Sequence, residues 1–313
     1  MKIAVLGGGA WGATFAKIQT DAGGDVTVWS ALPDELDRLK SEFSVEADLA
    51  RAIWPAEAIF LALPTTYLRE VLTKIRATGV NLAGKIFICL SKGVERETWR
   101  FGFEIAREVL PESVEIGVLS GPNLAAELAR KLPAAAVLAL PQIDRAKTLA
   151  GEFSNEYFKI HPGDDVAGVA LGGAYKNALA IAAGAINGAG LGNDLVALLV
   201  VKGLGEMTDF AEKSGARRET FYGISGLGDL LTTAFSSESR NFGFGKILGE
   251  TRDLDKAREL TQHKTVEGEI AAIGLAARRS ELDLPIVNLL AQTLTAKLAP
   301  DEFLKKLTRH LIS

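Results

Sequence analysis

The sequence predicts a doubly wound α/β domain built on a parallel sheet, followed by an all-α domain. Short apolar runs alternate with helical patterns through the first half of the chain, as expected for repeated strand, helix, strand units. A glycine-rich loop follows the first of these runs, and the second half shows only helical spacing. With 313 residues, the chain is long enough for two domains that each have their own core.

The first half contains six predicted strands, at residues 2–6, 25–29, 58–63, 85–90, 116–119 and 134–139. Several of them are apolar throughout, which is typical of parallel strands covered on both faces. Helical patterns lie between them, for example at residues 11–22, 65–77 and 98–109. This alternation predicts a Rossmann-type doubly wound sheet over residues 1–162.

The second half is predicted to be all-helical over residues 163–313. Its apolar residues recur at helical spacing in residues 169–186, 195–214, 240–248, 266–278 and 285–296, and a short amphipathic helix closes the chain at 300–313. We place the domain boundary near His161-Pro162-Gly163-Asp164, because a Pro-Gly pair ends one element and starts another.

Charge and cysteine content exclude several classes of protein. The formal net charge of -4 argues against a nucleic-acid partner, which usually requires a strongly basic surface. The single cysteine, Cys89, permits no disulfide within the chain and fits the reducing cytoplasm. Polar residues such as Lys176 interrupt the apolar stretch 166–191, so we expect a buried helix there and no membrane insertion.

The loop Gly7-Gly8-Gly9-Ala10-Trp11-Gly12 matches the pattern G-x-G-x-x-G between a strand and a helix. In this pattern Gly7 makes the tight turn, Gly9 lets the backbone approach a pyrophosphate, and Gly12 lets the helix pack closely on the sheet. The phosphates then face the positive end of the helix. The loop therefore predicts a site for NAD or NADP.

The end of the second predicted strand leaves the choice between NAD and NADP open. A carboxylate there favours the free ribose hydroxyl of NAD, whereas an arginine favours the 2′-phosphate of NADP. Ser30 and Ala31 provide neither signal. Asp34 and Glu35 follow Pro33 and are interpreted as the start of the next helix.

Three polar patches do not look like ordinary core. Lys92 lies in the segment Ser91-Lys92-Gly93 directly after a predicted strand, where a side chain points towards the ligand crevice of a doubly wound sheet. Lys176 and Asn177 lie inside an apolar helix and need polar partners, because burial without them costs several kcal/mol.

The third patch is Asp229 followed by Ser239-Arg240-Asn241. A serine ahead of a helix, with arginine and asparagine in the first turn, can bind a phosphate through the hydroxyl, the guanidinium and backbone N–H groups. The alternative is a plain helix N-cap with a surface arginine.

A nicotinamide cofactor beside a cationic, phosphate-sized pocket predicts hydride transfer to the carbonyl of a small phosphorylated substrate. Such a reaction needs a proton donor at the carbonyl oxygen, and no histidine occupies a candidate motif. A lysine serves when positive neighbours and desolvation lower its pKa. We therefore expect Lys176 to be the donor, near Lys92 and Arg240, with Asp229 holding it in place.

These motifs resemble those of the bacterial-type NAD(P)-dependent glycerol-3-phosphate dehydrogenases. The likeness runs over nearly the whole chain, through segments in this order: Gly7 to Gly12 with Trp11, Ser91-Lys92-Gly93-Val94-Glu95, Ser120-Gly121-Pro122-Asn123-Leu124-Ala125, Leu171-Gly172-Gly173-Ala174-Tyr175-Lys176-Asn177, Gly188-Ala189-Gly190-Leu191-Gly192, Gly203-Leu204-Gly205-Glu206-Met207, Gly226-Leu227-Gly228-Asp229-Leu230, Ser239-Arg240-Asn241 and Val266-Glu267-Gly268.

The resemblance implies reduction of dihydroxyacetone phosphate to sn-glycerol 3-phosphate for phospholipid synthesis, with NAD or NADP, no metal, and an active site between the two domains. It makes Lys176 the catalytic acid/base. It implies that the substrate is bound by Lys92, Gly121, Asn123, Lys176, Asn177, Asp229, Ser239, Arg240 and Asn241. It implies that the cofactor is bound by Gly7, Gly9, Ala10, Trp11, Gly12, Lys92, Ala125, Arg240 and Glu267. A homodimer is common among such enzymes.

The sequence departs from the family pattern after the second strand. Ala31 stands where the family usually has a basic residue, and the segment 40–49 is shorter than usual. Two other functions stay open at this point: a related two-domain dehydrogenase of another hydroxy acid or sugar acid, and a cofactor-binding sensor without turnover.

Overall fold

The computed structural model describes residues 1–261, 266–278 and 282–313. The chain forms two compact units. The first unit contains Met1–Ser91 and Phe101–Ala170, and the second contains Lys92–Arg100 and Leu171–Ser313. Each unit has its own core, and each is described by itself below.

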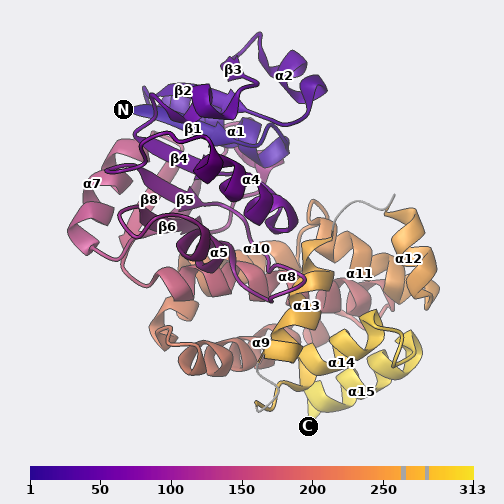
Figure 1. Cartoon of the computed structure of the whole chain (residues 1–313). Helices are drawn as coiled ribbons and strands as arrows, with labels where there is room; N and C mark the ends of the chain where they lie inside the picture. The colour runs from indigo at the N-terminus through magenta and orange to yellow at the C-terminus, as the bar shows by residue number, and fades with distance from the viewer. Residues whose placement is uncertain (262–265, 279–281) are drawn as a thin grey trace. The chain divides into compact units, whose positions relative to one another are not determined.

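The first unit is built on one eight-stranded sheet, in the order β3-β2-β1-β4-β5-β6-β7-β8 (Figure 1). The strands are β1 (Lys2–Leu6), β2 (Asp25–Trp29), β3 (Ser44–Glu46), β4 (Ala58–Leu61), β5 (Ile86–Cys89), β6 (Glu115–Ser120), β7 (Ala134–Ala139) and β8 (Phe158–Gly163). The strand order reverses between β1 and β4, which is where a doubly wound sheet binds its ligand, beyond the carboxyl ends of the strands. The predicted Rossmann-type sheet is confirmed.

The sheet differs from the prediction in three details. β7 pairs with β6 in the antiparallel direction, so the sheet is not wholly parallel. β3 has only three residues, which is too short to produce a sequence pattern. β8 lies at the sheet edge, where strands tolerate exposed polar residues and proline, and its side chains Lys159 and His161 are exposed.

Helices cover both faces of this sheet. They are α1 (Ala10–Asp21), α2 (Pro33–Leu39), α3 (Leu49–Ile53), α4 (Thr65–Ala77), α5 (Gly102–Val109), α6 (Ala125–Ala129) and α7 (Ile143–Phe153). One core cluster contains Phe15 of α1, Phe60 of β4 and Phe153 of α7, with neighbouring ring centroids 4.6 and 5.0 Å apart. Burial of these aromatic side chains holds α1 against the sheet, and this fixes the position of the glycine loop that leads into α1.

The predicted helix at residues 98–109 begins later than expected, at Gly102. Trp99 has a positive φ of 57°, which interrupts a helix, and the Thr98 hydroxyl donates to the Glu95 carboxylate at 2.5 Å. Glu104 then accepts the backbone N–H of Phe101 at 2.8 Å and starts the helix there. The segment Lys92–Arg100 belongs to the second unit.

The second unit is helical, as predicted. Its helices are α8 (Val166–Gly188), α9 (Asn193–Lys213), α10 (Asp229–Ala234), α11 (Arg240–Thr251), α12 (Leu254–Leu260), α13 (Glu267–Arg278), α14 (Pro285–Leu294) and α15 (Pro300–Ile312), with short turns at Arg218–Tyr222 and Ile224–Gly228. The expected boundary after residue 162 falls inside β8, and the division into units lies at Ala170, within α8. Pro162 and Gly163 are the last two residues of β8.

Helix α8 forms the centre of the second unit. By length and composition it could cross a membrane, but 94% of its apolar window is buried within the protein, as in a core helix. Its backbone contacts that of α11 directly: a Cβ at Gly184 would overlap the Phe242 carbonyl, and one at Gly245 would overlap the Ile181 carbonyl. This close contact fixes the start of α11 relative to the side chains of α8.

Candidate active site

Two lysines of the second unit share one buried aspartate. Nζ of Lys176, from α8, lies 2.7 Å from Oδ1 of Asp229, the first residue of α10. Nζ of Lys92, in the segment that joins the second unit, lies 2.7 Å from the other oxygen, Oδ2. The Asp229 side chain has no exposed surface, and the Lys176 and Lys92 side chains are 9% and 16% exposed. The sequence predicts that Asp229 holds Lys176 with Lys92 nearby, and the structure brings these three residues together.

The charges of this cluster act on one another at close range. Two largely buried ammonium groups share the buried carboxylate of Asp229, and the Glu267 carboxylate also acts on Lys92. Burial and the adjacent charge of Lys176 lower the pKa of Lys92, and the carboxylates of Asp229 and Glu267 oppose them, so that the pKa of Lys92 falls to about 8. Lys92 therefore gives up its proton far more readily than an exposed lysine.

Thr233 is a member of the cluster that the sequence analysis missed. Its hydroxyl lies 2.6 Å from Nζ of Lys176 and donates to the Asp229 carbonyl at 2.7 Å. The signal was present, because Thr233 follows Asp229 by one helical turn on the same face. Asp229 and Thr233 take two of the three donors of the Lys176 ammonium, which leaves one for a substrate oxygen.

Asn177 ties the lysine segment to α8. Its side-chain amide donates to the carbonyl of Lys92 at 2.7 Å. A Cβ at Gly268 of α13 would come 2.5 Å from the Asn177 carbonyl, and the Gly268 N–H donates to Oδ1 of Asn241 at 3.0 Å. Asn177 and Asn241 thus connect the Lys92 segment, α8, α11 and α13 to one another.

The expected phosphate patch lies at the start of α11. The Ser239 hydroxyl accepts the N–H of Phe242 at 3.2 Å and so caps this helix of 12 residues. Arg240 is exposed, Asn241 is half-buried, and Glu267 is half-buried at the start of α13. Ser239 therefore acts as an ordinary N-cap. The Arg240 guanidinium and the N-terminus of α11 are both groups that can bind an anion.

The glycine loop of the first unit fits a dinucleotide. Gly7 has a φ of +122°, and a Cβ there would come 2.5 Å from the Ala62 carbonyl. A Cβ at Gly12 would overlap the Gly7 carbonyl, so the turn requires glycine at both positions. Gly9 caps α1 without a side-chain bond, and no acidic residue occupies the first turn, so this helix end is suited to a pyrophosphate. Ala10 is exposed and Trp11 half-buried beside the loop.

A second loop of the first unit follows β6. A Cβ at Gly121 would lie 2.7 Å from the Ala135 carbonyl, and the Asn123 amide donates to that same carbonyl at 3.1 Å. Among the described residues, the buried Oδ1 of Asn123 has no hydrogen-bond partner. Such an orphaned acceptor fits a ligand hydroxyl or N–H. Ala125 is half-buried at the start of α6.

A buried glutamate lies behind the lysine cluster and was also missed. Glu206 of α9 accepts the N–H of Ile286 at 2.7 Å and that of Val287 at 3.3 Å, at the start of α14. The hydroxyl of Tyr175, the neighbour of Lys176, lies 3.4 Å from Glu206 Oε2. Burial raises the pKa of Glu206 to about 7, although these hydrogen bonds act to lower it.

Glu206 should make the stability of the protein depend on pH. Its pKa is higher in the folded protein than in the unfolded chain, so its contribution is full below pH 4.5 and is lost as the pH rises through about 7. Relative to Glu206→Gln, the native protein should lose about 3 kcal/mol of unfolding free energy between pH 4.5 and 8. Urea unfolding of both proteins across this range measures the difference.

The matched control for this experiment is Asp194→Asn, an exposed carboxylate in the first turn of the same helix. It should follow the native curve at every pH. Parallel curves for native protein and Glu206→Gln would show that the buried carboxylate does not titrate in this range.

The two units together define a class of protein: nicotinamide-dependent dehydrogenases that join a Rossmann-type unit to a helical one bearing a buried lysine. Within the described residues, no group of three or more His, Cys, Asp or Glu side chains could hold a metal ion.

The chain belongs to the NAD-dependent glycerol-3-phosphate dehydrogenase family. The N-terminal part of that family matches residues 2–44 and 38–146, and the C-terminal part matches residues 165–305. The resemblance predicted from the motifs is confirmed. A glycerol-3-phosphate dehydrogenase [NAD(P)+] of Rhodopseudomonas palustris is 37% identical over 327 residues, covering 99% of this chain and 97% of the relative. One of Corynebacterium diphtheriae is 36% identical, covering 92% of each.

Solved structures agree with this assignment. A crystal structure of glycerol-3-phosphate dehydrogenase from Coxiella burnetii aligns with a TM-score of 0.90 and 29% sequence identity. The alignment covers 100% of this chain and 98% of the Coxiella chain. The fold extends more widely, because a D-mandelate dehydrogenase with NADH aligns with a TM-score of 0.61 at 14% identity. That likeness concerns the fold alone.

Proposed function

We propose that this protein reduces dihydroxyacetone phosphate to sn-glycerol 3-phosphate, in a reversible hydride transfer that uses NADH or NADPH. The observation that carries the proposal is the Lys176–Asp229–Lys92 cluster in a member of this family. The product provides the backbone for glycerophospholipids, and the reaction takes place in the cytoplasm. The predicted homodimer stays a prediction.

The dinucleotide supplies the hydride when it is bound. In this proposal the first unit is the cofactor domain, and the loop holds the pyrophosphate through Gly7, Gly9, Ala10, Trp11 and Gly12. The N-terminus of α1, which no side-chain hydrogen bond caps, supports this role. Ala125, Lys92, Arg240 and Glu267 complete the proposed cofactor contacts.

Lys176 is the proposed acid. Its ammonium is held by Asp229 and Thr233 at 2.7 and 2.6 Å, so the remaining donor has a defined direction. As the substrate carbonyl becomes an alkoxide, Lys176 donates a proton to that oxygen, and in the reverse direction it accepts the proton. The nearby positive charge of Lys92 stabilises the developing negative charge on the oxygen.

The remaining residues are proposed to hold the substrate. Asn241, Arg240 and the N-terminus of α11 suit the phosphate, whereas Gly121 and the orphaned acceptor of Asn123 suit the hydroxyl end. Asn177 keeps Lys92 in place through its carbonyl. Ser239 supports the same site as the cap of α11.

Absorbance of reduced nicotinamide tests the reaction directly. Purified protein with dihydroxyacetone phosphate and NADH or NADPH should show a substrate-dependent loss of signal. Arg240→Ala should raise the KM for dihydroxyacetone phosphate about 100-fold, because a guanidinium bond to a phosphate contributes roughly 2–3 kcal/mol. The KM for the cofactor should change less.

Lys246→Ala is the matched control, since Lys246 is an exposed cation on the same helix. It should retain the native KM. An unchanged KM in Arg240→Ala would mean that the substrate carries no phosphate at this site. That outcome would favour a dehydrogenase of another hydroxy acid, an alternative that the family membership does not favour.

A further inference from the structure

The residues at the end of β2 include no carboxylate, but a carboxylate from α2 lies against the glycine loop. Glu35, in the first turn of α2, accepts the N–H of Gly8 at 3.1 Å through Oε2. The same oxygen accepts the hydroxyl of Ser30 at 2.5 Å, and Ser30 is the residue that follows β2. From the sequence, Glu35 is interpreted only as part of the start of a helix. It does start the helix, but its side chain returns to the loop.

The sequence spacing also suits this role. A carboxylate that reads the adenosine ribose normally follows the glycine motif by about twenty residues and comes from the end of the second strand. Glu35 follows the motif by a comparable distance, and its bond to Ser30 places the carboxyl group at the end of β2. A Cβ at Gly8 would come 2.8 Å from Oε2, so the carboxylate lies against the loop itself.

Ser30 keeps this arrangement rigid. Its side chain is buried, it donates to Glu35, and it accepts the N–H of Leu32 at 3.1 Å. Glu35 is itself only half-buried, so part of the carboxylate can meet a ligand. The carboxyl group is therefore oriented before any ligand arrives.

We propose that Glu35 sets the cofactor preference of this protein: its carboxylate accepts the 2′-hydroxyl of the adenosine ribose and disfavours a 2′-phosphate, so NAD(H) binds more tightly than NADP(H). The inference rests on the proposed binding of a dinucleotide at the glycine loop. A hydroxyl donates to a carboxylate, whereas a phosphate has no proton to donate at neutral pH and repels it.

Arg38 is the group that opposes this preference. Its guanidinium donates to the Gly8 carbonyl at 2.7 Å, and an arginine near this position would ordinarily attract a 2′-phosphate. Arg38 is exposed, so water and salt screen its charge, whereas Glu35 is held by two hydrogen bonds. A phosphate that reached Arg38 would still lie beside the Glu35 carboxylate.

Equilibrium binding tests the inference without turnover. NADH and NADPH differ only at the 2′ position of the adenosine ribose, which carries a hydroxyl in NADH and a phosphate in NADPH. Titration of nicotinamide fluorescence gives the Kd of the native protein for each, and the two values show which group the protein prefers. We expect NADH to bind at least about tenfold more tightly. Glu35→Gln should lower the ratio of the Kd for NADPH to the Kd for NADH by about tenfold or more, because it weakens the binding of NADH and strengthens the binding of NADPH.

The control variant is Asp34→Asn, which removes an exposed carboxylate from the adjoining position of α2. It should leave the ratio unchanged, and thermal unfolding should show that both variants fold. Equal native Kd values, tighter NADPH, or an unaltered ratio in Glu35→Gln would overturn the inference while leaving the dinucleotide site in place. Failure of both dinucleotides to bind folded protein would overturn the site and the inference with it.

Discussion

Replacement of Lys176 by alanine should lower kcat for dihydroxyacetone phosphate reduction by about 1,000-fold, within the range expected for loss of a general acid. Asp229 and Thr233 hold the Lys176 ammonium in place. Lys92 is the other proton donor of the described cluster, and its ammonium binds the second oxygen of Asp229. Dinucleotide binding should be retained, because the glycine loop belongs to the first unit. Steady-state kinetics and NADH titration of the same preparation measure the two effects.

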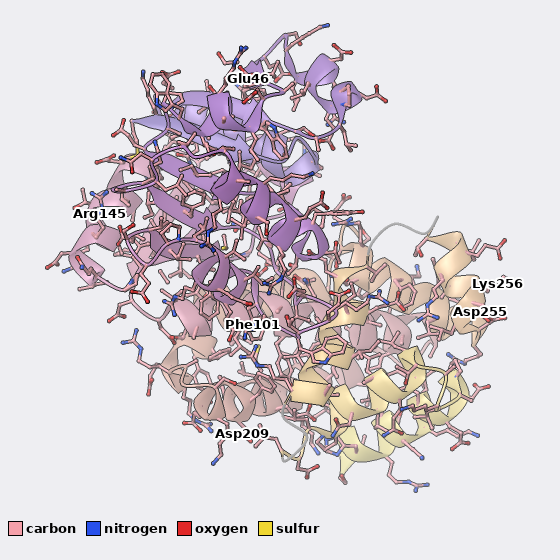
Figure 2. All side chains as sticks on the ribbon, viewed as in Figure 1. Glu46, Phe101, Arg145, Asp209, Asp255 and Lys256 are labelled. Atoms are coloured by element: carbon pink, nitrogen blue, oxygen red, sulfur yellow. The ribbon has the colours of Figure 1, made fainter. Side chains whose placement is uncertain are left out.

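Two further measurements separate chemistry from structural damage. A small primary amine added in solution should restore part of the rate in Lys176→Ala, because it can occupy the vacated space and donate a proton. Lys256→Ala, which removes an exposed lysine of α12, should behave like the native protein (Figure 2). A near-native kcat in Lys176→Ala would contradict the acid role of this lysine.

The fold could be predicted largely because its signals are local. Apolar runs such as 2–6 and 25–29 identify buried strands, and the glycine loop identifies the turn between β1 and α1. The antiparallel direction of β7 could not be predicted in this way, because an apolar strand has the same pattern in either direction. Nor could the short strand β3 be recognised, since three residues carry no period.

The candidate site was predicted only where a residue was unusual for its surroundings. Lys176 stood out as a charge in an apolar helix, and the structure supplies its partners Asp229 and Thr233. Glu206 and Glu35 gave no such signal, because a glutamate in an ordinary helical pattern is usually solvated. Their roles depend on contacts with Ile286 and Gly8, which are distant in the chain and become visible only once the fold is known.

Asp229→Asn should be the most destabilising single change in the lysine cluster. The carboxylate has no exposed surface and accepts both ammonium groups, so its loss leaves two largely buried cations without that counter-charge. Breaking a buried ion pair in this way costs about 3–5 kcal/mol. Urea unfolding at pH 7 should show this loss. Asp209→Asn should cost less than about 1 kcal/mol, because the side chains of Asp209 and its partner Arg218 are 60% and 41% exposed.

The pH dependence of that loss identifies its cause. Lys92 already has a pKa of about 8, below the ordinary lysine value, and Asp229 is a group that raises it, so the substitution should lower it further. When the pKa of a lysine is lower in the folded protein than in the unfolded chain, the free energy of unfolding is highest at high pH. It decreases as the pH falls through the pKa of the folded state. The deficit of Asp229→Asn should therefore be large at pH 7 and shrink towards pH 10, where Lys92 can fold uncharged. A deficit that is the same at both pH values would mean that lost packing, and not the unpaired charge, is responsible.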